Sequence, residues 1–123
     1  MILIIDTSNN EEIKLALEKD GSIFKSKRIR AYRSQAEKLL PAIEALVKVS
    51  KIKFSGIKKI KVAHRGGSFT ALRIGILTAN ALAYALKIPV ETIEKDQKKI
   101  KSFKNFNIVI PDYNRDLDIK YNS

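Results

Sequence analysis

The chain has 123 residues, of which 45% are hydrophobic and 30% are charged, and it contains no cysteine. This composition excludes a disordered polar chain, disulfide bonds and thiolate metal sites, and the length fits one domain with a modest core. The formal net charge is +11, and residues 21–61 alone carry twelve basic and two acidic side chains. A segment this basic could bind the phosphates of RNA.

The first third of the chain predicts three antiparallel strands. Residues 2–5 are a short apolar run that lacks the basic flank of a signal peptide, so we expect a soluble, cytoplasmic protein. Residues 12–18 alternate between apolar and polar side chains, and residues 22–30 contain a further strand-like run. Asp20-Gly21 between them is typical of a hairpin turn. The three runs therefore predict a meander.

The apolar period then becomes helical over residues 34–49. Ser34 and Glu37 have the spacing of a capping box at its start. Pro41 should kink this helix or delay its start. The next expected elements are a strand over 57–63, a helix over 68–86 with Ser68 as N-cap, and a strand that opens at 88–90.

The end of the chain is more polar. Residues 94–105 predict a short helix or a linker, and residues 107–110 a strand that pairs back with 117–121 as a hairpin. The order β-β-β-α-β-α-β predicts an α/β fold with a mixed sheet and helices on one or both faces, as in a single actin-like or ribonuclease H-like lobe. We assign residues 1–93 to that lobe and residues 94–123 to a linker and short hairpin tail.

The helix over 68–86 is apolar on nearly every face, although its polar residues make a membrane span a poor fit. Small residues recur every four positions along it, which allows a second helix to approach closely. A lobe of this size has little protein to cover such a face, so we expect a partner interface on the two helices. A bulky charged residue at Gly75 or Ala79 should then give a folded monomer. The predicted interface residues are Leu39, Ile43, Leu46, Leu72, Gly75, Ile76, Ala79 and Ala83.

Three sequence blocks carry a family resemblance: Ile-Ile-Asp-Thr-Ser at 4–8, Ser-Gln-Ala-Glu-Lys-Leu-Leu-Pro-Ala-Ile at 34–43, and Gly-Ser-Phe-Thr-Ala-Leu-Arg-Ile-Gly at 67–75 followed by Ile-Pro-Val at 88–90. In this order and spacing they resemble the TsaB family, also called YeaZ. The resemblance implies the actin-like superfold. Members of this family usually have two lobes, and this chain would hold the first. Residues 107–121 resemble the opening of the second lobe, where Asp112, Arg115 and Asp118 correspond to its recurring residues.

The resemblance also implies a function. The chain would be a non-catalytic subunit without a cofactor that supports the paralogue TsaD, together with the ATPase TsaE, in making threonylcarbamoyladenosine in tRNA. It would dock its two helices on those of TsaD, form homodimers through the same face, and meet tRNA indirectly. The sequence departs from the family's glycine-rich run at Ala63, Arg65, Gly66 and Ala71.

Two other functions stay open. A small nucleotide-binding domain would use an acid and hydroxyls near the strand and helix ends; its residues would be Asp6, Thr7, Ser68, Thr70 and Arg73. An RNA-binding accessory protein would use a basic strip; its residues would be Lys25, Lys27, Arg28, Arg30 and Arg33. His64 has no partner spacing typical of a catalytic or metal site, so we interpret it as a surface or loop-packing residue and expect no metal site.

Overall fold

The computed structural model describes residues 1–67, 69–94 and 97–111. Its first part is the predicted meander: β1 (Ile2–Asp6), β2 (Glu12–Lys19) and β3 (Ser22–Arg30) pair antiparallel in sequence order. Asp20 and Gly21 both have positive φ, at 52° and 81°, which is the geometry of the tight turn predicted between β2 and β3.

The rest of the sheet is parallel to β1. After α1 (Gln35–Val49) and the short helix η1 (Phe54–Gly56), β4 (Lys59–Val62) pairs parallel with β1. After α2 (Phe69–Leu86), β5 (Val90–Thr92) pairs parallel with β4. The five-stranded sheet has the order β3-β2-β1-β4-β5, which confirms the predicted mixed sheet.

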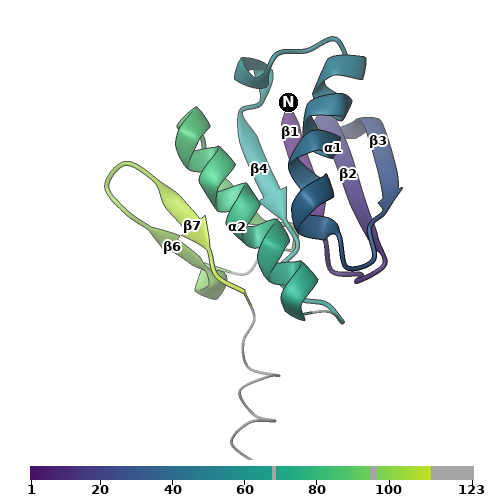
Figure 1. Ribbon diagram of the computed structural model, residues 1–123. Helices are drawn as coiled ribbons and strands as arrows, with labels where there is room; N and C mark the ends of the chain where they lie inside the picture. The colour runs from purple at the N-terminus through teal and green to yellow at the C-terminus, as the bar shows by residue number, and fades with distance from the viewer. Residues whose placement is uncertain (68, 95–96, 112–123) are drawn as a thin grey trace, which may run out of the picture.

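Both α-helices lie side by side on one face of this sheet (Figure 1). Alternate strand side chains point into the layer between sheet and helices, as the period of two requires. The centre of that layer is fully buried and apolar, which is the main source of the fold's stability. Its strand members are Leu3, Ile5, Ile13, Leu15, Leu17, Ile60, Val62 and Val90.

Helix α2 approaches β1 at Gly75. A Cβ atom on Gly75 would lie 2.2 Å from Oγ1 of Thr7, which is closer than any real contact. Thr7 is itself fully buried, and its hydroxyl donates a hydrogen bond of 2.7 Å to the carbonyl oxygen of Ala71. The small residues on α2 therefore allow the helix to pack closely against the sheet of its own lobe.

Two expectations for α1 need correction. The helix begins at Gln35 and continues through the exposed Pro41, so the proline does not delay its start, while the alternative of a kink stays a prediction. Ser34 occupies the N-cap position, but its side chain makes no capping hydrogen bond, so the predicted capping box is not formed.

The segment after β5 forms a second, smaller sheet. A short helix, η2 (Gln97–Lys99), leads into β6 (Ile100–Ser102), which pairs antiparallel with β7 (Asn107–Val109). The strand predicted at 107–110 is thus confirmed, but its partner lies at 100–102, where we expected a short helix or linker. The hairpin predicted with residues 117–121 lies outside the described residues.

Two asparagine side chains attach β7 to the lobe. The amide of Asn80 on α2 accepts from the N–H of Val109 at 2.9 Å and donates to its carbonyl at 3.0 Å. The amide of Asn107 accepts from the N–H of Val90 at 3.0 Å and also donates to the Val90 carbonyl. Each amide thus makes the pair of backbone hydrogen bonds that a neighbouring strand would make. The predicted boundary at residue 93 stays a prediction, although β7 packs directly against α2 and β5.

By length and composition, α2 could cross a membrane, a property that core helices of soluble proteins share. Here the helix buries six of its residues against the sheet and its neighbours.

Candidate functional site

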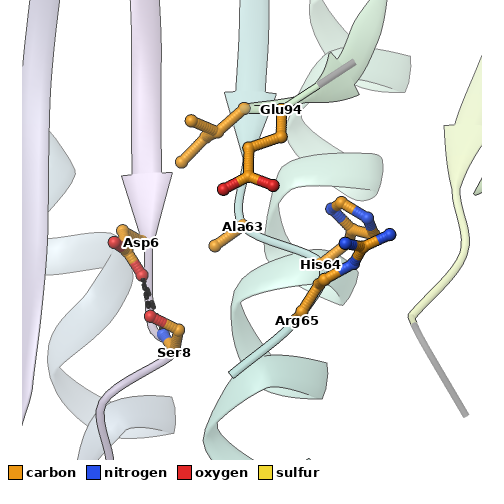
Figure 2. A pocket seen from close by; sticks show the side chains of 7 residues that line it. Asp6, Ser8, Ala63, His64, Arg65 and Glu94 are labelled. Carbon is orange, nitrogen blue, oxygen red and sulfur yellow. Dashed lines mark hydrogen bonds between the residues drawn. The ribbon is translucent and has the colours of Figure 1, made fainter. Parts of the chain in front are cut away.

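A pocket of about 160 Å³ lies where β1, β4 and β5 end. Its polar side chains come from the last residue of β1 and from the segments that follow the three strands (Figure 2). Asp6 and Ser8 lie on the β1 side, and His64, Arg65 and Glu94 lie on the β4 and β5 side. In open α/β sheets, ligands bind at the carboxyl ends of parallel strands. The fold therefore places a small polar pocket at the position where this architecture binds ligands.

The structure does not bring together the residues predicted to contact a nucleotide. Of these, Asp6 alone lines the pocket among the described residues, and its carboxylate accepts hydrogen bonds from the N–H of Ser8 at 2.9 Å and its hydroxyl at 2.5 Å. Thr7 points the other way, into α2, and is buried. Thr70 and Arg73 are exposed on α2, and the Arg73 guanidinium lies over the ring of Phe69 at 5.5 Å. Ser68 lies outside the described residues.

Sequence reasoning missed the other side of the pocket. His64 is only 2% exposed, and it lines the pocket together with Arg65 and Glu94. His64 and Arg65 come two and three residues after β4, and Glu94 comes two residues after β5. The preference of ligands for the carboxyl ends of parallel strands could therefore have identified them. Among the described residues, no three His, Asp or Glu side chains are grouped so as to hold a metal ion.

The eight residues predicted to form a partner interface are all buried within the chain. Leu39, Ile43 and Leu46 of α1 are at most 1% exposed, and Ala79 and Ala83 of α2 are fully buried. These side chains hold the helices on the sheet, so the choice of these residues as exposed surface was wrong. For the same reason, a bulky charge at Gly75 or Ala79 would disrupt the fold instead of giving a folded monomer.

A different set of side chains on the same helices faces solvent. Leu77 and Tyr84 of α2 are 62% and 65% exposed, and Leu40 of α1 is 45% exposed. The exposed positions of α2 follow one stripe at helical spacing, and the only charge on it is Arg73. Its members are Thr70, Arg73, Leu77, Ala81, Tyr84 and Ala85, which we call the outer face of α2.

The basic strip predicted on β3 is not a single surface. Residues alternate between the two faces of a strand, so Lys25 and Lys27 lie on the opposite side from Arg28 and Arg30. Arg28 donates a hydrogen bond of 2.8 Å to the carboxylate of Glu12. This bond lowers the pKa of the Glu12 carboxyl and raises the pKa of the Arg28 guanidinium. Arg33 lies over the ring of Tyr32, outside β3.

The sheet order, with two helices on one face and a pocket at the strand ends, defines a lobe of the actin-like, ribonuclease H-like class. A family model described as "TsaD: tRNA N6-adenosine threonylcarbamoyltransferase" matches residues 29–102. The chain is 28% identical over 109 residues to the tRNA threonylcarbamoyladenosine biosynthesis protein TsaB of Bacillus subtilis strain 168, covering 89% of this chain and 47% of that protein.

Solved structures agree with this relationship. YeaZ from Pseudomonas aeruginosa is 32% identical, with a TM-score of 0.68 over 75% of this chain and 42% of that chain. A second structure, of an uncharacterized protein with similarity to peptidase YEAZ from Pseudomonas aeruginosa, gives the same values. The chain therefore belongs to the family of the TsaD model, among its TsaB (YeaZ) members. It spans a little under half the length of these relatives.

Proposed function

We propose that this chain is a non-catalytic, TsaB-like subunit that binds and supports a TsaD-like enzyme in tRNA threonylcarbamoyladenosine modification. The family and the name of the Bacillus relative support the pathway. The outer face of α2 supports a role in binding, and it is the observation that carries the proposal. A TsaE-like ATPase, a homodimer, indirect contact with tRNA and a cytoplasmic location stay predictions.

The outer face of α2 differs from the solvent face of an ordinary surface helix. Such faces carry mostly charged and polar side chains. Here Leu77, Ala81, Tyr84 and Ala85 are exposed in a helix of 18 residues whose single charge is Arg73. Burying apolar area of this kind is the main driving force of association. We therefore assign the partner surface to this face together with Leu40 of α1.

Binding to the TsaD-like protein of the same cell tests the proposal. The variant Leu77→Gln removes an exposed apolar side chain while keeping a good helix former, so the lobe should fold normally. If Leu77 is a central contact, affinity for the partner should fall on the order of 30-fold, as for an interface hot spot. The matched control is Ile23→Gln, because Ile23 is 56% exposed on β3, away from the helices.

Light scattering and titration calorimetry provide the measurements. The proposed subunit gives a complex of defined mass with the partner, weakened by Leu77→Gln and unaffected by Ile23→Gln. A wild-type chain that is monomeric and does not bind the partner would contradict the proposal. Equal losses in both variants would contradict the assignment to α2.

Nucleotide binding is the second candidate, because the strand-end pocket occupies the position expected of a ligand site. Two carboxylates and the Arg65 guanidinium line this pocket, so a phosphate there would be attracted by Arg65 and repelled by Asp6 and Glu94, and a cation bound with it would offset that repulsion. Titration of the chain with ATP and Mg²⁺ tests this function, and saturable binding that is lost in Asp6→Asn would support it.

A further inference from the structure

The tip of the β6–β7 hairpin carries a cluster of aromatic rings. The N–H of Phe103 donates to the carbonyl of Phe106 at 2.7 Å, which closes a turn over Lys104 and Asn105. The two phenylalanine rings stack with centroids 4.8 Å apart and planes inclined by 17°. Phe106 also meets Tyr84 of α2 edge to face, with centroids 5.2 Å apart. The cluster thus joins the hairpin tip to the lobe.

These rings are open to solvent. Phe103 is 52% exposed although Phe106 stacks on it, so one face of the Phe103 ring remains available. Beside the rings is a hollow of about 320 Å³ between the hairpin and the end of α2. Ala83, Ile88 and Pro89 supply its apolar wall, and Asn105 contributes a polar side chain. Such a surface can accept a flat apolar ring with a polar edge.

The charged side chains of the hairpin, and the one that lines the hollow, are all positive. Residues 97–111 contain four lysines and no acidic residue. Lys101 and Lys104 are exposed on the hairpin, and Lys87 lines the hollow from the end of α2. An apolar protein partner would gain nothing from these lysines. A polyanion with flat bases matches both the rings and the charges, since stacking and phosphate contacts combine in single-strand binding sites.

The geometry points to a binding site for single-stranded nucleic acid at this hairpin tip. A base stacks on the open face of Phe103, and the adjoining phosphates meet Lys101 and Lys104. The hairpin is held in place by the Asn80 and Asn107 amides, so the platform is preorganised. This site is separate from the predicted basic strip on β3, and it requires no TsaD-like partner.

Fluorescence anisotropy of a labelled 12-nucleotide RNA, and of DNA of the same sequence, tests the inference with the full chain. Phe103→Ala should weaken binding on the order of 10-fold or more, as expected for one lost stacking contact. Phe103→Trp should retain binding, which separates loss of stacking from loss of folding. The control is Phe24→Ala, because Phe24 is 49% exposed on β3 and should leave binding unchanged.

The contribution of the lysines can be measured separately, through the salt dependence of binding. Replacing both Lys101 and Lys104 by alanine should reduce the slope of log affinity against log salt by about 1.4, since each single-strand phosphate contact contributes about 0.7. Lys48→Ala with Lys53→Ala is the matched control, because both lysines are exposed and lie outside the hairpin and outside the basic strip predicted on β3. The RNA and DNA arms distinguish which nucleic acid is preferred, and binding of either supports the site.

Three outcomes would overturn the inference. The first is the absence of saturable binding at low salt. The second is binding that depends on the lysines but is equally tight in Phe103→Ala, which would indicate charge alone. The third is Phe103-dependent binding to vesicles containing anionic lipid without binding to oligonucleotide, which would indicate a membrane surface. Leu77→Gln should leave oligonucleotide binding unchanged, so this test and that of the proposed subunit role fail independently.

Discussion

Thr7, directly after β1, and Gly75 of α2 are in close contact. The Thr7 hydroxyl is satisfied by the Ala71 carbonyl at 2.7 Å, and the space it needs exists because residue 75 has no Cβ. The hydroxyl near the end of β1, which the sequence suggested for phosphate binding, is therefore occupied within the core. A buried hydroxyl with its hydrogen bond made stabilises the fold, whereas an unsatisfied one would cost free energy.

Gly75→Ala should lower the free energy of unfolding by about 1–3 kcal/mol, as expected for overpacking. Helix propensity alone would favour alanine by about 1 kcal/mol, so the sign of the change decides which effect wins. Urea unfolding provides the measurement. In a Thr7→Ala background the added Cβ no longer meets Oγ1, and the same substitution should cost much less. If Gly75→Ala instead raises the free energy of unfolding of the otherwise wild-type chain, the Thr7 side chain has room for the added Cβ and the overpacking argument is wrong.

The hairpin β6–β7 is attached mainly by side chains. Asn80 and Asn107 each satisfy both polar groups of one backbone residue, on Val109 and Val90 respectively. Val90 and Val109 are both buried, so removing either amide would leave an N–H and a carbonyl without partners. Such groups are expensive to bury.

Asn107→Ala should therefore lower the free energy of unfolding by about 1–3 kcal/mol. Amide hydrogen exchange should show faster exchange at Val90, whose N–H loses its acceptor. Asn105→Ala is the control, because Asn105 is exposed in the neighbouring turn and should behave like wild type. Unchanged exchange at Val90 in Asn107→Ala would show that water replaces the amide without cost.

At the scale of the whole molecule, the sequence predicted the order of elements well because that order depends on local signals. Apolar alternation, the Asp20-Gly21 turn and helical spacing set the meander and both helices. The interface residues were wrong because periodicity identifies an apolar stripe without showing which side faces the sheet. The pairing of β6 was missed because its three residues carry a single apolar side chain, and tertiary bonds from Asn107 and Asn80 stabilise the hairpin.

A chain ending at residue 93 tests the predicted domain boundary. Val109 belongs to the buried core and Ile100 packs against it, so their removal should expose part of the lobe. With the two amide contacts also lost, we expect the free energy of unfolding to fall by about 3–5 kcal/mol. Thermal unfolding followed by circular dichroism measures the change. A shortened chain as stable as the full one would show that residues 94–123 are a separate appendage.

The Asn107 amide has a further consequence for how copies of this molecule behave toward each other. It occupies the hydrogen-bonding groups of Val90 at one border of the five-stranded sheet, so a strand from another copy would find these two groups already paired. The opposite border, β3, is protected instead by its lysines and arginines. Repulsion between these charges on two copies opposes pairing of their β3 strands. Salt screens the second kind of protection but leaves the first intact. Stacking of copies into fibrils would therefore begin at β3, and concentrated salt would favour it.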